Sequence, residues 1–564
     1  MITNPRSSSF EICSLIMKFL FACFCVAAMI WLAGCGTTTG TTSSSTGTTS
    51  TSTTLTASPT SATVGTAITF TATVTPSTAT GKVSFYDGTT STTLGTSTLS
   101  SGTATLSTSA LATGTHSVTA TYAGDTTYGS STSSAVTVTI TAATSTSSSS
   151  CGLGTAEYVL SSGSATQDGQ TYSATSEDES GVCAENYGTS LTLTSPTITT
   201  SGDTSSTDNS SFYGLNAAVL AYGSSASTDS GATITVTNGS ITTTGSGANG
   251  VFASGLGSTV NITGTTITAS GGNAHGLDAA EAGALNITSV TATTSGASGS
   301  VIATDRGGGT VTISGGTYKT SGERSAGIYS TGTVTCSNAA SFTTSDAEGI
   351  VVEGSNSVTS KACTYNSTNA TDNRSIFIYN SESGDASAGT GTLTMTGDSY
   401  TWNSTSSPLF YITNTTANIV LNGVAFTNNS TALLTAEANS SWGTTGSNGG
   451  KVTLTAIGQS LTGAIVIDSI STLTMTLSDS SAYSGALNAA DTASSVTLTL
   501  DATSTWNVLG DSYVTVLNDT SEISGTTINN ITGNGYTVYY VSSSNSALGG
   551  ETYTLNGGGY LKPM

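Results

Sequence analysis

Charged residues are scarce in this sequence: they make up 7% of its 564 residues, with 10 Lys and Arg against 32 Asp and Glu. The net charge of −22, with no local basic cluster to offset it, argues against nucleic-acid binding because phosphate would be repelled. Proline is rare, and the 66 glycines keep no three-residue period, which excludes collagen. Hydrophobic residues still reach 36%, many of them β-branched, so wholesale disorder is not expected. The composition is typical of a β-rich protein.

The N-terminal segment predicts export and lipidation. Phe19 to Trp31 is an almost unbroken apolar run, shorter than the about 20 residues of a spanning helix but suited to a signal-peptide core. Leu32-Ala33-Gly34-Cys35 resembles the lipobox of bacterial lipoproteins. This resemblance implies that residues 1–34 are a signal peptide and that Cys35 carries acyl chains, with Gly36 matching the outer-membrane sorting pattern. A plain secretory signal with a chance cysteine is the alternative.

Four cysteines follow the lipidation site: Cys151, Cys183, Cys336 and Cys363. In an oxidising compartment an even number suggests disulfides, here Cys151 with Cys183 and Cys336 with Cys363, although connectivity cannot be deduced from sequence. Buried free thiols remain the alternative.

The sequence predicts no metal site and no cofactor. No CxxC pair or His/Cys spacing typical of zinc is present. Several acidic residues between Asp168 and Glu185 could hold Ca²⁺ through oxygen ligands. Because no calcium-binding repeat accompanies them, a solvated loop is the preferred interpretation.

Tracts rich in Ser and Thr divide the remaining chain. Residues 35–54 and 141–150 cannot bury apolar surface, so they are predicted to be a flexible tether and a linker. Between them, residues 55–140 alternate apolar and polar positions and carry regularly spaced Gly, Pro and Asp turns, which predicts an antiparallel β-sandwich. His116 is expected on the surface of one of its strands.

The sandwich region resembles a known repeat in three of its segments: Gly81–Gly88, Gly114–Tyr122 and Gly124–Tyr128. They are similar to the bacterial immunoglobulin-like (Ig-like) repeat of surface proteins. That resemblance implies a spacer or adhesive module without catalysis.

Residues 151–564 carry a repeat of about 25 residues, a length typical of solenoid units. Tracts such as Gly250–Ala253 and Gly276–Ala279 recur, with short alternating strands between them and no helical apolar face. One such unit cannot close a core alone, but stacked units can. The sequence therefore predicts an all-β chain in which the Ig-like sandwich precedes a long right-handed parallel β-helix with N- and C-terminal caps. Val260, Ile262 and Ile267 are expected to point inward.

The repeat region also resembles the β-helical passenger domains of adhesin-like bacterial surface proteins. The residues that carry this resemblance are Phe212–Val219, Thr304–Val311, Pro408–Ile412 and Ser504–Ser512. The resemblance implies the fold but no common catalytic motif.

An outward-facing column of side chains is the candidate ligand-binding site. Aligning the repeats places the second residue after each opening Gly or Ser on one face, giving Asn216, Phe252, Asp278, Ile302, Tyr329 and Val351. From this column Asn216, Phe252, Asp278 and Tyr329 are the candidates for contacting a glycan or a protein partner. Mixed aromatic and polar side chains suit a groove that stacks sugar rings.

A polysaccharide-cleaving enzyme is the alternative, because parallel β-helices also include pectate lyases and polygalacturonases. Glycosidases need two carboxyl groups on one face. The candidates are Asp278, Asp305 and Glu353, with Arg306 near them. The paired Asp and Gly-His-Gly pattern of polygalacturonases is absent, which puts this activity in doubt.

Taken together, the sequence predicts a lipid-anchored protein of the bacterial cell envelope, on the outer membrane or the cell surface. Its expected role is adhesion or scaffolding, with a polysaccharide or protein ligand on the β-helix. The membrane, contacted through the lipid on Cys35, is the other expected partner.

Overall fold

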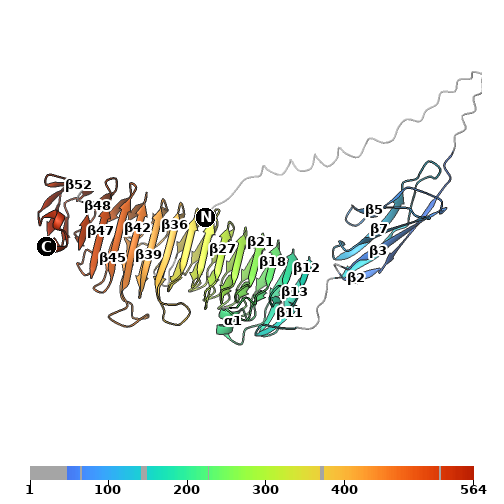
Figure 1. Cartoon of the computed structure of the whole chain (residues 1–564), viewed down its shortest axis with the longest axis horizontal. Coiled ribbons are helices and arrows are strands. Elements are labelled where there is room, and N and C mark those ends of the chain that lie inside the picture. The colour runs from blue at the N-terminus through green and yellow to red at the C-terminus, as the bar shows by residue number, and fades with distance from the viewer. Residues whose placement is uncertain (1–46, 64–65, 142–148, 227, 369–373, 520–521) are drawn as a thin grey trace, which may run out of the picture.

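The computed structural model describes residues 47–63, 66–141, 149–226, 228–368, 374–519 and 522–564 (Figure 1). Residues 1–46, which hold the expected signal peptide, Cys35 and most of the tether, lie outside this range, as does most of the expected 141–150 linker. Within the described residues, no helix combines the length and hydropathy needed to cross a bilayer.

The first domain is a two-sheet sandwich. One sheet has the order β1-β3-β6 and the other β2-β9-β7-β4-β5, with β8 beside β7. Its strands are β1 (Ser52–Ser58), β2 (Ser61–Thr63), β3 (Ile68–Thr75), β4 (Lys82–Asp87), β5 (Thr92–Thr98), β6 (Thr103–Thr108), β7 (Gly114–Tyr122), β8 (Ser131–Thr132) and β9 (Val136–Thr141). Alternating residues of β3, β4 and β7 fill the core between the sheets, as the period-2 pattern predicts.

His116 lies inside this sandwich, so its expected surface position is wrong. The side chain is buried, and Nδ1 lies 2.8 Å from Asp87 Oδ2, while Nε2 lies 2.7 Å from the Ala112 carbonyl. Burial alone would lower the pKa of His116, but these two hydrogen bonds raise it above its ordinary value. The residue links β4 to β7 and has a structural role.

The rest of the chain forms a parallel β-helix built from three long sheets, called here sheets I, II and III (Figure 1). In the central coils, each coil contributes one strand to each sheet, and each strand pairs in parallel with its counterpart in the next coil. At the N-terminal edge of sheet I the first two strands pair antiparallel. The predicted all-β architecture is confirmed. Val260, Ile262 and Ile267 point into the common core, as predicted.

Sheet I has thirteen strands. They are β10 (Ser149–Cys151), β11 (Gly154–Leu160), β14 (Glu179–Glu185), β17 (Val219–Tyr222), β20 (Val251–Ser254), β23 (Leu277–Ala280), β26 (Ile302–Thr304), β29 (Ile328–Ser330), β32 (Ile350–Glu353), β35 (Ile376–Tyr379), β38 (Phe410–Thr413), β41 (Ala432–Ala436) and β44 (Ala464–Ile467).

Sheet II has fourteen strands. They are β12 (Ser164–Asp168), β15 (Ser190–Thr194), β18 (Thr233–Thr237), β21 (Thr259–Thr263), β24 (Ala284–Thr288), β27 (Thr310–Ser314), β30 (Thr333–Ser337), β33 (Ser357–Lys361), β36 (Thr390–Thr396), β39 (Thr415–Asn422), β42 (Gly450–Ile457), β45 (Thr472–Ser478), β47 (Ser495–Leu500) and β50 (Val516–Asn518).

Sheet III has ten strands. They are β13 (Thr171–Ala174), β16 (Thr197–Thr200), β19 (Ser240–Thr243), β22 (Thr266–Ala269), β25 (Thr291–Thr294), β28 (Thr317–Thr320), β31 (Ser341–Ser345), β34 (Thr364–Thr368), β37 (Ser399–Trp402) and β40 (Ala425–Asn428).

A mixed nine-stranded sheet closes the C-terminal end, where antiparallel pairing of β54 with β55 and two 3-10 turns interrupt the parallel stacking. Its elements are β43 (Ser460–Thr462), β46 (Ala482–Gly485), β48 (Thr505–Val508), β49 (Ser512–Val514), β51 (Ile523–Ser524), β52 (Thr527–Thr532), β53 (Thr537–Tyr540), η2 (Ser542–Ser544), η3 (Ser546–Leu548), β54 (Tyr553–Asn556) and β55 (Tyr560–Pro563).

The α-helix α1 (Thr207–Tyr213) interrupts one coil and contacts β20 and β23 of sheet I. The Ser206 side chain accepts a hydrogen bond from the Asn209 N–H and so caps the first turn. Gly214, with a φ of 72°, ends the helix in the left-handed conformation, where its N–H bonds to two carbonyls of the helix. The two caps fix the ends of this short helix, which packs against the outer face of sheet I.

Candidate functional site

Sheet I carries the predicted outward column, with two corrections. Phe252, Asp278, Tyr329 and Val351 share one register position on its outer face. Ile302 does not, because it pairs with Leu277 and points into the core; Ala303 takes the column position instead. The alignment of that repeat was one residue out of register, which reverses the face of every side chain in a strand.

Asn216 also lies outside the column. The insertion of α1 shifts the strand of its coil to Val219–Tyr222, so Leu220 holds the column position. Asn216 is fully buried in a left-handed turn, where Nδ2 donates to the Gly202 carbonyl at 2.6 Å. Its interactions are those of a turn residue and not of a ligand-binding one.

A groove of about 400 Å³ runs over the outer face of sheet I. Its walls come from α1, from the turns before β23 and after β26, and from loops that follow β35 and β41. Among its lining side chains are Phe212, His275, Asp305, Phe377, Tyr379 and Trp442. The groove therefore combines ring faces with ionisable groups drawn from coils far apart in the sequence.

Two carboxyl groups and an imidazole meet beside this groove. One ligand atom from each of His275, Asp278 and Asp305 lies within 4.8 Å of the others. Asp278 is 0% exposed, and Asp305 is 7% exposed and lines the groove. Gly307 and Gly308, both with positive φ, form the tight turn that follows Asp305. The structure thus brings together Asp278 and Asp305, two of the three catalytic candidates.

Burial dominates the electrostatics of this cluster. It raises the pKa of Asp278 well above its ordinary value, and the neighbouring Asp305 adds to the rise. Burial likewise raises the pKa of Asp305 to about 8, with further contributions from Asp385 and Glu353. Burial lowers the pKa of His275 to about 4. Each shift reflects the cost of placing a charge where solvent does not reach it.

Glu353, the third catalytic candidate, is held by other partners. It is 1% exposed, Tyr329 Oη donates to Oε2 at 2.6 Å, and the Ser381 N–H and hydroxyl both donate to Oε1. Tyr329 is therefore tied to Glu353 across neighbouring coils. Glu353 does not line the groove, but its carboxylate holds Tyr329, which does.

Two arginines join the charged and aromatic parts of the groove. Arg306 Nη2 donates to Asp385 Oδ1 at 2.9 Å, and its guanidinium lies 3.7 Å from the centroid of the Phe212 ring. Arg374 Nε lies 2.8 Å from Glu348 Oε1, and its guanidinium lies 4.1 Å from the Phe377 ring centroid. Cation–π contact and ion pairing together hold these walls in place.

Arg374, Phe377 and Trp442 were not found by sequence reasoning. Trp442 lies on the loop after β41, and its ring centroid lies 5.2 Å from that of Phe377. Phe377 continues the outward column, because it pairs with Val351, so extending the repeat alignment by one coil would have found it and the nearby Arg374. For Trp442 the signal is the long insert between β41 and β42, because long inserts in a solenoid are loops on one face.

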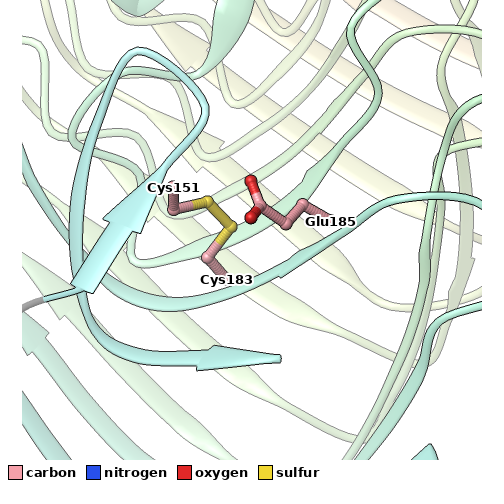
Figure 2. A group of neighbouring side chains, drawn as sticks. All are labelled: Cys151, Cys183 and Glu185. Atoms are coloured by element: carbon pink, nitrogen blue, oxygen red, sulfur yellow. A yellow bond between two sulfur atoms is a disulfide. The ribbon is translucent and has the colours of Figure 1, made fainter. Parts of the chain in front are cut away.

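The structure contains the disulfides Cys151–Cys183 and Cys336–Cys363. Figure 2 shows the first of them, with the Glu185 carboxylate close to its sulfur atoms. Glu185 also accepts a hydrogen bond from the Gly152 N–H at 3.2 Å. Because the sulfurs are bonded to each other, neither is a thiolate ligand, and this group is a staple that ties β10 to β14.

The comparisons with known proteins concern the sandwich. Residues 55–141 match the bacterial Ig-like domain family, group 3. No curated protein and no solved structure matches the chain. The fold defines a protein that joins a bacterial Ig-like domain to a parallel β-helix, an architecture that fits a role at a surface.

Proposed function

We propose that this protein is displayed on the bacterial cell surface and binds an extended polysaccharide in the groove of sheet I. The observation that carries the proposal is the pair of half-buried aromatic side chains Tyr379 and Trp442, which pack on the buried Phe377 ring in an open groove that also presents carboxyl and guanidinium groups. Aromatic faces stack on sugar rings, and polar groups at their edges accept or donate hydrogen bonds to hydroxyls.

The charge of the groove favours a neutral glycan. Its lining includes four carboxyl groups, on Asp208, Asp305, Glu348 and Asp385, and two guanidinium groups, on Arg324 and Arg374. The whole chain carries a net charge of −22. A polyanionic chain would be repelled over a long range, whereas a neutral chain would not.

The substitution Trp442→Ala is expected to weaken glycan binding about tenfold, which corresponds to about 1.4 kcal/mol. The half-buried Trp442 ring is available for stacking, and its removal takes one face from the groove. A panel of neutral and acidic glycans, followed by calorimetry on the best binder, measures the effect.

Tyr187→Ala is the matched control, since this aromatic side chain is 74% exposed and lies outside the groove. It should bind like the wild type. Equal affinities for all three proteins, or no binding to any glycan, would refute the groove as a polysaccharide site.

Surface display is proposed to depend on Cys35. Growth with a palmitate analogue should label the wild-type chain and leave Cys35→Ser unlabelled, with the variant found outside the membrane fraction. The sequence around Cys35 supports this expectation. A labelled variant would show that this cysteine is not the acylation site.

Cleavage of the bound glycan is the second candidate, favoured by the position of Asp305 in the groove with Asp278 beside it. Two neighbouring carboxyl groups are what glycoside hydrolases use. Reducing ends that appear in the binding mixtures, and disappear with Asp305→Asn, would establish cleavage instead of simple binding.

A further inference from the structure

Asp278 is a buried carboxyl group without a hydrogen-bond partner. Its side chain is 0% exposed, and neither carboxylate oxygen has a partner at hydrogen-bond geometry among the described residues. The nearby Ala279 N–H lowers the pKa of Asp278, but burial outweighs it. The nearest basic atom is His275 Nε2, which lies 4.0 Å from Asp278 Oδ2, too far for a hydrogen bond. Buried charged groups in proteins are paired or bind metal ions.

The neighbours of Asp278 in the column do not satisfy it. Phe252 and Ala303 hold the adjacent positions, and neither side chain has a donor. Asp305, a second acidic group, raises the electrostatic cost further. Replacing Asp278 with an apolar residue would remove this cost, so an uncompensated pair is a poor structural solution.

We propose that His275, Asp278 and Asp305 bind a divalent transition-metal ion at the floor of the groove. An ion between the three side chains would supply the positive charge that the two carboxylates lack. It would also give the Asp278 oxygens the partner that the protein does not provide.

The geometry of the three side chains suits such an ion. Their ligand atoms all lie within 4.8 Å of one another, and two ligands on one ion are at most about 4.4 Å apart when each bond is about 2.2 Å. Small side-chain rotations would therefore bring the three ligand atoms within bonding distance of one ion. One imidazole with two carboxylates is a mixed donor set that suits Zn²⁺, Mn²⁺ or Fe²⁺ better than Ca²⁺.

The site leaves room for a further ligand. His275 and Asp305 line the groove, whereas Asp278 lies beneath it. Three protein ligands leave at least one coordination position open on the ion. That position faces the groove, where a water molecule or a sugar hydroxyl could occupy it.

The test uses the full chain, purified without chelator, stripped with EDTA and titrated with ZnCl₂ in a calorimeter. Wild type should bind one ion per chain and gain thermal stability with Zn²⁺. Asp278→Asn should lose the stabilisation and bind at least about tenfold more weakly. Glu323→Gln, which alters a 55% exposed carboxyl group outside both the groove lining and the cluster, should bind like wild type.

Thermal unfolding in EDTA separates metal binding from folding. Without metal, Asp278→Asn should be about as stable as wild type, because Asn has a similar size and removes an ionisable group that is buried beside Asp305. Wild type that binds no Zn²⁺, Mn²⁺ or Fe²⁺, or binding that Asp278→Asn leaves unchanged, would overturn the proposal. Equal loss in Glu323→Gln would show nonspecific binding to acidic groups and overturn it as well.

Discussion

Gly271→Ala is expected to destabilise the β-helix by about 3 kcal/mol. Gly271 belongs to a column of glycines at the corner after sheet III, and an added Cβ would overlap the Gly245 carbonyl oxygen of the preceding coil. The obstacle is backbone, so no side-chain rotation can relieve it. The same close approach recurs along the column at Gly245, Gly271, Gly296 and Gly322.

Gly272→Ala is the control for this prediction. Neither glycine has a positive φ, so the two substitutions differ in space and not in backbone conformation. A Cβ at Gly272 would meet nothing closer than the Ala297 carbonyl oxygen at 3.8 Å. Chemical denaturation should show a change within about 1 kcal/mol. Equal stabilities for the two variants would mean that the coils separate easily at this corner.

Tyr365→Ala is expected to cost about 3–5 kcal/mol, the usual loss for a buried aromatic side chain. The ring lies inside sheet III, 5.1 Å from the centroid of Phe342 and 5.3 Å from that of Tyr400, and it is stacked on both. Its removal opens a cavity in a column that begins at Tyr318.

Tyr365→Phe separates the ring from the hydroxyl group. The Tyr365 hydroxyl lies 2.9 Å from Ser360 Oγ, so losing it should cost about 1 kcal/mol. Tyr187→Ala, at a 74% exposed position, should change stability by less than about 0.5 kcal/mol. Denaturant unfolding followed by tyrosine fluorescence measures the free energy of unfolding of the three variants. An equal loss of stability in all three would contradict the stacked aromatic core.

The fold was predictable because the alternation of apolar and polar residues within each strand identifies that strand locally. The alternation at Val260 and Ile262 identifies both the strand and its inward face without reference to any other coil. Register between coils was less secure, as Ile302 shows, because a solenoid tolerates repeats of unequal length. The predicted column position of Asn216 was wrong for the same reason, because α1 lengthens the coil to which Asn216 belongs.

The candidate site was predictable only in part. Asp278 and Asp305 were found because neighbouring coils place their repeats side by side. His275 was not among the candidates, since it lies in neither a zinc-like spacing nor the Gly-His-Gly pattern of polygalacturonases. Trp442 lies on the long loop between β41 and β42, where periodicity carries no information. Arg374 lies just before β35, one coil beyond the alignment that was made.

By itself, the sequence determined that this chain is built of strands, which side chains fill the coils, and that an Ig-like sandwich precedes the β-helix. These features depend on local alternation and on turns, which neighbouring residues encode. Only the tertiary structure decided the groove and the buried cluster beside it. Phe212, His275, Asp305 and Trp442 come from four separate coils, and stacking those coils is what brings their side chains together.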